Sequence, residues 1–192
     1  MAEAAHIAVL RRGPLDDRAL PAGAGFTLTP APPSARLILR GDGAVARASG
    51  AAFGVEVPMK SGAPGTRDGR AAIWLGPDEW LLIAEREEPA ALAATLEAAL
   101  ADHPHSLVDV SKRQIGLELS GPLARRALSA GCPLDLRDEA FPVGFATRTM
   151  LAKSEIVLWR RAARAYRVEV WRSFAEYVVD YLGEAARRAP PT

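Results

Sequence analysis

The 192-residue sequence has little of several features that would point to a particular class of protein. Cys132 is the sole cysteine, so the chain cannot form an internal disulfide, and no Cys and His residues have the spacing typical of a zinc site. Basic and acidic side chains nearly balance, 24 against 23, which argues against non-specific nucleic-acid binding. No stretch approaches the roughly 20 apolar residues of a membrane-spanning helix, and the N-terminus lacks the pattern of a secretory signal. We therefore expect a soluble, cytoplasmic protein that binds neither nucleic acid nor membrane.

Motifs that carry chemistry are also scarce. Residues 41–46, Gly-Asp-Gly-Ala-Val-Ala, have the spacing of a dinucleotide-binding loop, but Asp42 would place a carboxylate beside the phosphates, and the elements that follow are typical of an antiparallel hairpin. We interpret this segment as a helix start with Asp42 as N-cap. Cys132 follows a predicted helix C-terminus, where the helix dipole disfavours a thiolate, so we expect a buried structural cysteine. His103 and His105 have no evident third metal ligand, and the residues alone indicate no catalytic, cofactor-binding or metal site.

What the chain does contain is an internal repeat of about 80 residues. Residues 1–24, which carry Gly and Pro, are interpreted as an N-terminal arm. Residues 25–104 and 105–192 then show the same order of elements: two strands, a helix, a pair of strands and an amphipathic helix. The last helix has apolar residues at i, i+3, i+4, i+7, i+8 and i+11 from Phe174, and Ser173 with Glu176 predicts a capping box at its start.

This order predicts an α+β fold of two similar ferredoxin-like halves, with antiparallel sheets and helices packed on them. The two halves are expected to form one compact unit. Short strands are predicted at residues 26–29, 37–40, 71–75, 80–84, 107–110, 115–119, 155–159 and 166–171. Helices are predicted to start at Asp42, at Pro122, near Pro89 and at Ser173.

Arginine and tryptophan supply the candidate interaction residues. Four arginines gather around the tip of a predicted hairpin: Arg160, Arg161, Arg164 and Arg167. They form either a solvated turn or a surface that docks onto an acidic partner. Alternation along residues 166–171 places Trp171 on the same, more polar face as Arg167 and Glu169. Trp171 is therefore an interface candidate, unless the other half of the protein covers that face too.

Several motifs follow one another in order over residues 107–186. They are Val108-Asp109-Val110-Ser111 with Arg113-Gln114, Leu119-Ser120-Gly121-Pro122, Gly131-Cys132-Pro133-Leu134-Asp135-Leu136, Phe141-Pro142-Val143-Gly144, Thr147-Arg148-Thr149, and the segments 153–160 and 169–175. With Gly76-Pro77-Asp78-Glu79-Trp80-Leu81 in the first half, this series resembles the gamma-subunit family of heterotetrameric sarcosine oxidases. Lys112 departs from the His common in that family. Asp109, Ser111 and Arg113 are expected to form a local polar network that holds a chain reversal.

The resemblance implies a fold related to the folate-binding aminomethyltransferases, such as the glycine-cleavage T protein. It implies a complex with alpha, beta and delta subunits that demethylates sarcosine oxidatively to glycine and hydrogen peroxide and passes the one-carbon unit to tetrahydrofolate. In such complexes the partner subunits hold FAD, FMN, NAD and tetrahydrofolate, so no cofactor is expected in this chain.

The resemblance therefore favours a non-catalytic structural subunit with no active site of its own. Its candidate interface residues are Arg148, Trp171 and Arg172. The alternative is a stand-alone folate-binding or one-carbon-transfer protein with the same fold.

Overall fold

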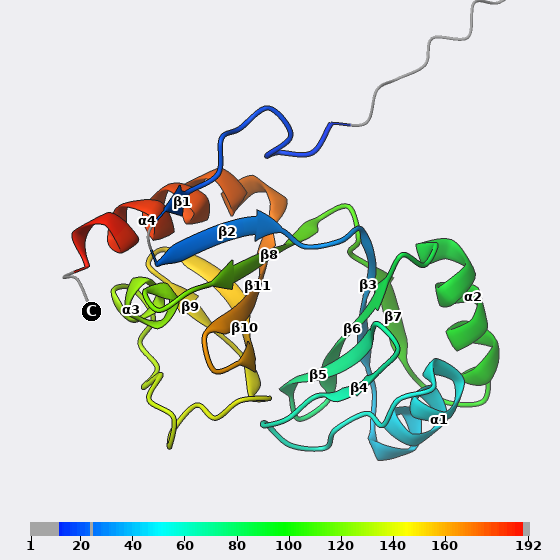
Figure 1. Ribbon diagram of the computed structural model, residues 1–192. Coiled ribbons are helices and arrows are strands. Elements are labelled where there is room, and N and C mark those ends of the chain that lie inside the picture. Colours follow the sequence, from blue (N-terminus) through cyan, green and yellow to red (C-terminus); the bar gives the residue numbers. More distant parts are fainter. Residues whose placement is uncertain (1–11, 24, 190–192) are drawn as a thin grey trace, which may run out of the picture.

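Residues 12–23 and 25–189 are described in the structure, a computed structural model. Within them, two antiparallel sheets lie face to face, and each carries two helices on its outer face (Figure 1). Buried apolar residues form three clusters, one under each pair of helices and one between the sheets. This arrangement confirms the predicted α+β class with antiparallel sheets and packed helices.

The six-stranded sheet belongs mainly to the second repeat. Its order is β1 (Ala22–Gly23), β2 (Phe26–Pro30), β8 (Gln114–Ser120), β11 (Ala165–Trp171), β10 (Ser154–Ala162) and β9 (Ala146–Leu151). The helices α3 (Ala124–Ser129) and α4 (Ala175–Arg188) cover it. Alternate residues of β11, Tyr166 and Val168 among them, point to these helices and meet the predicted apolar stripe of α4, which includes Val178 and Leu182.

The five-stranded sheet has the order β4 (Gly65–Arg67), β5 (Arg70–Gly76), β6 (Glu79–Glu85), β3 (Ser34–Arg40) and β7 (Ser106–Asp109), under α1 (Gly43–Phe53) and α2 (Pro89–Ala99). As predicted, Asp42 caps α1, because its Oδ1 accepts hydrogen bonds from the amides of Ala44 at 2.8 Å and Val45 at 3.0 Å. Trp80 is fully buried in β6 and donates its indole N–H to the Pro58 carbonyl at 2.6 Å.

The opening strand of each repeat lies in the sheet of the other repeat. β2 comes from the first repeat but pairs with β8, with Leu28 opposite Leu119, whereas β7 comes from the second repeat but pairs with β3, with Leu39 opposite Leu107. Figure 1 shows both crossings, where the chain passes from β2 to β3 and from β7 to β8. The sheets are therefore tied together by two exchanged strands. The boundary between residues 104 and 105 stays a prediction from the repeat.

Two predicted helix starts were wrong. A 3₁₀ turn over Arg172–Phe174 precedes α4, and no side chain caps either element, so Ser173 and Glu176 form no capping box. Glu176 instead forms an ion pair with Arg18. The helix α3 starts at Ala124 rather than Pro122, because the left-handed Gly121 (φ 112°) turns the chain first. No helix within the described residues is both long and apolar enough to span a bilayer.

Candidate functional site between the two sheets

The polar face of β11 lies between the two sheets. Arg167 and Glu169 are only 1% and 2% exposed, whereas Trp171, at the end of the strand, is 39% exposed. Of the two interpretations of this face, coverage by the other half therefore holds for Arg167 and Glu169. Because a buried charge must be paired and hydrogen-bonded, the partners of these two side chains define a strongly constrained polar site.

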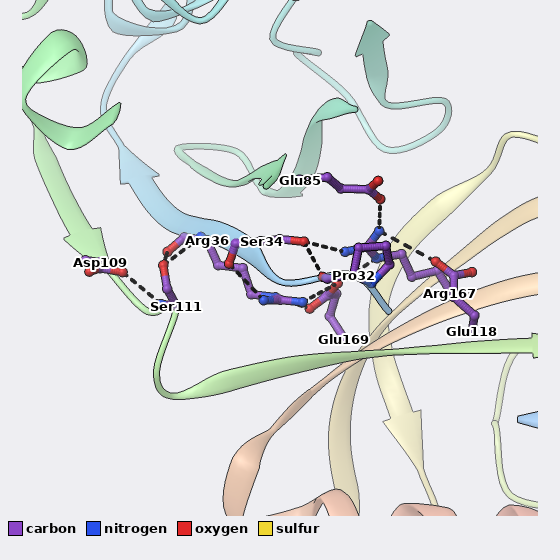
Figure 2. Close-up of polar contacts among 9 residues, drawn as sticks. All are labelled: Pro32, Ser34, Arg36, Glu85, Asp109, Ser111, Glu118, Arg167 and Glu169. Carbon is purple, nitrogen blue, oxygen red and sulfur yellow. Dashed lines mark hydrogen bonds and ion pairs between the residues drawn. The ribbon is translucent and has the colours of Figure 1, made fainter. Parts of the chain in front are cut away.

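Glu169 is the centre of a buried ion network, shown in Figure 2. Its Oε2 accepts a hydrogen bond from Nε of Arg36 at 2.5 Å, and its Oε1 accepts one from Nε of Arg167 at 2.7 Å. Arg167 also donates through Nη1 to Oε1 of Glu85 at 2.6 Å. Arg36 lies on β3 and Glu85 on β6, so these bonds join the six-stranded sheet to the five-stranded sheet at two points.

Further charges complete the network at its partly exposed rim. Nη1 of Arg161 lies 3.2 Å from Oε1 of Glu118 and 3.7 Å from Oε1 of Glu85. The network then holds three cations (Arg36, Arg161, Arg167) and three anions (Glu85, Glu118, Glu169). Its charges therefore balance internally.

The electrostatics keep Glu169 ionised. Burial acts to raise the pKa of its carboxyl, but the charges and hydrogen bonds of Arg36 and Arg167 outweigh burial and hold the pKa below its ordinary value. Burial raises the pKa of Glu118 at the rim, although Arg167 and Arg161 oppose the shift. A carboxylate that is saturated by two guanidinium groups and stays ionised at neutral pH is suited to hold the sheets together rather than to transfer protons.

Backbone contacts anchor the network on the side of β7. The Ser111 hydroxyl accepts a hydrogen bond from the Arg36 amide at 2.9 Å, and the Asp109 carboxylate accepts one from the Ser111 amide at 2.8 Å. The predicted local polar network is therefore confirmed for Asp109 and Ser111. The Arg113 side chain is not part of this network, because its guanidinium lies over the Trp171 ring, 5.0 Å from the ring centroid.

The structure places the three candidate interface residues in two different settings. Arg148 on β9 donates to Glu79 on β6 at 2.5 Å, so it forms another ion pair between the sheets, and its side chain is 32% exposed. Trp171 and Arg172 lie together at the end of β11, where Arg172 donates to the Arg12 carbonyl of the arm. Their role in an interface stays a prediction.

Two of the four hairpin arginines are buried and two are exposed. Arg160 is 3% exposed and donates to the Phe141 carbonyl and to Asp138, both at 2.7 Å, and Arg167 is buried in the network. A solvated turn was wrong for these two residues, because their long stems carry the guanidinium groups inward to acceptors. Docking is wrong for Arg167, which lies between the sheets, and stays a prediction for Arg160. Arg161 and Arg164 are exposed.

The segment that resembles a dinucleotide loop does not fit a phosphate group. The Asp42 carboxylate already accepts the two amide N–H groups that a phosphate would need, and β3 pairs antiparallel with β6 and β7. Cys132 is buried, as predicted. Within residues 12–23 and 25–189, no three His, Cys, Asp or Glu side chains gather as metal ligands. His105 instead contacts the His103 carbonyl and Glu97.

Sequence comparisons place this architecture in a family. Residues 40–188 match the model of the "Sarcosine oxidase, gamma subunit family". "Sarcosine oxidase subunit gamma" of Corynebacterium sp. (strain P-1) is 42% identical over 135 residues, which cover 70% of this chain and 66% of that protein. The protein of the same name from Arthrobacter sp. is 40% identical over 144 residues, 74% of this chain and 70% of that protein. The chain thus spans 66% of the length of the first of these relatives.

Structural comparisons agree. A chain of the heterotetrameric sarcosine oxidase from Corynebacterium sp. U-96, solved in complex with pyrrole 2-carboxylate, has a TM-score of 0.86 and 35% identity, over 95% of this chain and 98% of that chain. The glycine cleavage system aminomethyltransferase T from Bartonella henselae has a TM-score of 0.61 at 14% identity, over 83% of this chain and 45% of that chain, which shows a shared fold. Because the family model matches well over half of the sequence, this chain belongs to the sarcosine oxidase gamma subunit family.

Proposed function

We propose that this chain is the gamma subunit of a heterotetrameric sarcosine oxidase and acts as a structural subunit of that complex. The observation that carries the proposal is the match to a chain of a heterotetrameric sarcosine oxidase over 95% of this chain and 98% of that chain. If both chains pack against the same kind of partner subunits, their folds should match over nearly their full length, as they do here.

In the proposed complex, alpha, beta and delta subunits supply the chemistry. That chemistry is the oxidative demethylation of sarcosine to glycine and hydrogen peroxide, with transfer of the one-carbon unit to tetrahydrofolate. We propose that the partner subunits hold FAD, FMN, NAD and tetrahydrofolate, and that this chain carries no cofactor. The ion network supports a structural role, because its most buried carboxylate, Glu169, is saturated by arginines of the chain itself.

A structural subunit needs a rigid body and a surface to bury. The inter-sheet ion pairs supply rigidity, because Arg36 and Arg148 each join one sheet to the other. Trp171, Phe174 and Tyr177 are large hydrophobic residues with 38–39% exposure, and they follow one another at three-residue spacing where β11 leads into α4. Permanent complexes bury large and fairly apolar interfaces, in which aromatic residues and arginine are enriched. Trp171 and Arg172 therefore remain our proposed contact residues, with Arg148 as a third.

The test is an affinity pull-down of the tagged chain from an extract of its own cells, with mass spectrometry and a flavin absorbance scan of the eluate. Stoichiometric recovery of large flavin-bearing subunits, together with sarcosine-dependent formation of hydrogen peroxide, would support the proposal. A colourless chain that elutes alone would contradict it.

The alternative is a stand-alone folate-binding protein, which the fold shared with aminomethyltransferase T motivates. A shared fold does not establish a shared activity. Isothermal titration of the isolated chain with tetrahydrofolate distinguishes the two functions. Micromolar binding would favour the alternative, whereas no measurable heat at high concentration would contradict it.

A further inference from the structure

A basic cleft of about 440 Å³ opens beside the tip of the β10–β11 hairpin, next to the start of α3. Its charged lining residues, which define what we term the arginine cleft, are Arg125, Arg126, Asp138, Arg160 and Arg164. Arg125 and Arg126 are neighbours on α3. Arg160 and Arg164 belong to the β10–β11 hairpin, and Asp138 lies in the loop before β9.

The arginine cleft concentrates positive charge in a chain whose net charge is only +1. Asp138 is its one acidic lining residue among four arginines, and it already accepts hydrogen bonds from Arg160 at 2.7 Å and Arg125 at 3.1 Å. The inter-sheet network has three cations and three anions, so its charges balance. In the cleft, by contrast, Arg125, Arg160 and Arg164 face the single carboxylate of Asp138, which is a local excess of cations. Concave walls of low dielectric focus such a field and attract anions.

The floor of the cleft is rigid. Arg160 is 3% exposed, and its two terminal nitrogens donate to the carbonyl oxygens of Phe141 at 2.7 Å and Ala163 at 3.0 Å. Its Nε is buried without a hydrogen-bond partner in the described part of the chain. A buried N–H that lacks an acceptor is costly, and the Arg160 guanidinium adds its positive charge to the floor of the cleft.

The mouth of the cleft is open, because Arg125, Arg126 and Arg164 are all exposed there. We propose that the arginine cleft docks an acidic segment of a partner subunit, with an Asp or Glu carboxylate held between Arg125 and Arg164. The forked N–H groups of arginine match a carboxylate in a bidentate geometry. Charge complementarity of this kind sets the register of two proteins and speeds their encounter. This inference rests on the proposed function, because it names the chemistry of the partner surface in the same complex.

The experiment compares three forms of the tagged chain in binding to the other subunits, isolated from the complex. The double variant Arg125→Gln/Arg164→Gln removes two charges from the cleft. The matched control Arg47→Gln/Arg67→Gln removes two charges from exposed arginines on the half of the molecule that carries the five-stranded sheet. We expect the cleft variant to bind about tenfold or more weakly than wild type, with a weaker dependence on salt, and the control to bind like wild type.

Circular dichroism of each form confirms folding. The single variant Arg164→Gln leaves the Asp138 ion pairs intact and provides a second, milder test. Wild-type affinity of the cleft variant, or an equal loss in the control, would overturn the inference while the proposed function stands. Failure of the wild-type chain to bind any partner would instead refute the proposed function.

A free anion is the other possible occupant. If inorganic phosphate raised the unfolding temperature of wild type but not of the cleft variant, while both assembled equally well, the cleft would be a small-anion site and the docking inference would be wrong.

Discussion

Replacing Glu169 with Gln tests whether the buried ion network holds the two sheets together. The change keeps the shape of the side chain and removes its charge. It leaves Arg36 and Arg167 buried, at 4% and 1% exposure, without the carboxylate that accepts a hydrogen bond from each of them. Removing one partner of a buried ion pair costs about 3–5 kcal/mol, because the remaining charge is left uncompensated.

Urea unfolding, followed by tryptophan fluorescence, measures this loss. With a slope of about 2–3 kcal/mol per molar urea, the midpoint should fall by roughly 1–2.5 M relative to wild type. The control is Glu184→Gln, which removes an exposed carboxylate that pairs with Arg187 and Arg188 at the surface and should leave the midpoint nearly unchanged. A Glu169→Gln midpoint equal to that of the control would refute the argument.

The pH dependence of this difference has a definite sign. The pKa of Glu169 is lower in the folded protein than its ordinary value of 4.5, so its stabilising contribution is present above 4.5 and is lost as the pH falls through the folded pKa. The gap between wild type and Glu169→Gln should therefore narrow in acid.

Three further predictions concern other sites. Gly116→Ala should cost about 1–3 kcal/mol in urea unfolding, because its new Cβ would lie 2.8 Å from Oε1 of Glu169; a wild-type midpoint would contradict this close approach. His105 should titrate above 6.5 by NMR, because both a backbone carbonyl and Glu97 favour its charged form. Its stabilising effect is then present below 6.5 and lost as the pH rises through the folded pKa, and Glu97→Gln should lower its titration midpoint. Trp80→Phe should lower stability by about 1–3 kcal/mol, since it leaves a gap in the core and a carbonyl without its indole donor; thermal unfolding measures the change, and a loss below the experimental error would refute it.

Local interactions explain why most elements could be predicted from the sequence. Asp42 caps α1 through amides two and three residues away, and Gly54 ends that helix in a left-handed conformation with φ 76°. The apolar stripe of α4 and the alternation of β11 are periodicities within one element. Where the prediction failed, at Ser173, contacts with a distant segment accompany the different helix start, because Arg18 pairs with Glu176 and Arg172 donates to the Arg12 carbonyl.

Pairing between distant strands could not be predicted in the same way. The sequence indicated short strands at residues 26–29 and 107–110, but the repeat by itself did not say which sheet each would join. Phe26 and Leu28 of β2 complete the core under α3 and α4, which the other repeat builds, whereas β7 adds only the partly buried Leu107 to the core of the first repeat. The arginine cleft could not be predicted either. Arg125, Asp138 and Arg164 are far apart in the sequence, and the repeat pattern did not indicate that they line one cleft.

By itself, the sequence determined that Arg167 and Glu169 share one face of a strand, opposite Tyr166 and Val168, because side chains alternate along every strand. Only the tertiary structure decided that this polar face is buried. A strand looks the same in sequence whether its polar face meets water or a charged partner sheet, and Arg36 lies on a strand more than 130 residues away in the chain. Burial and ion pairing are properties of packed segments, so they emerged only when the two sheets came together.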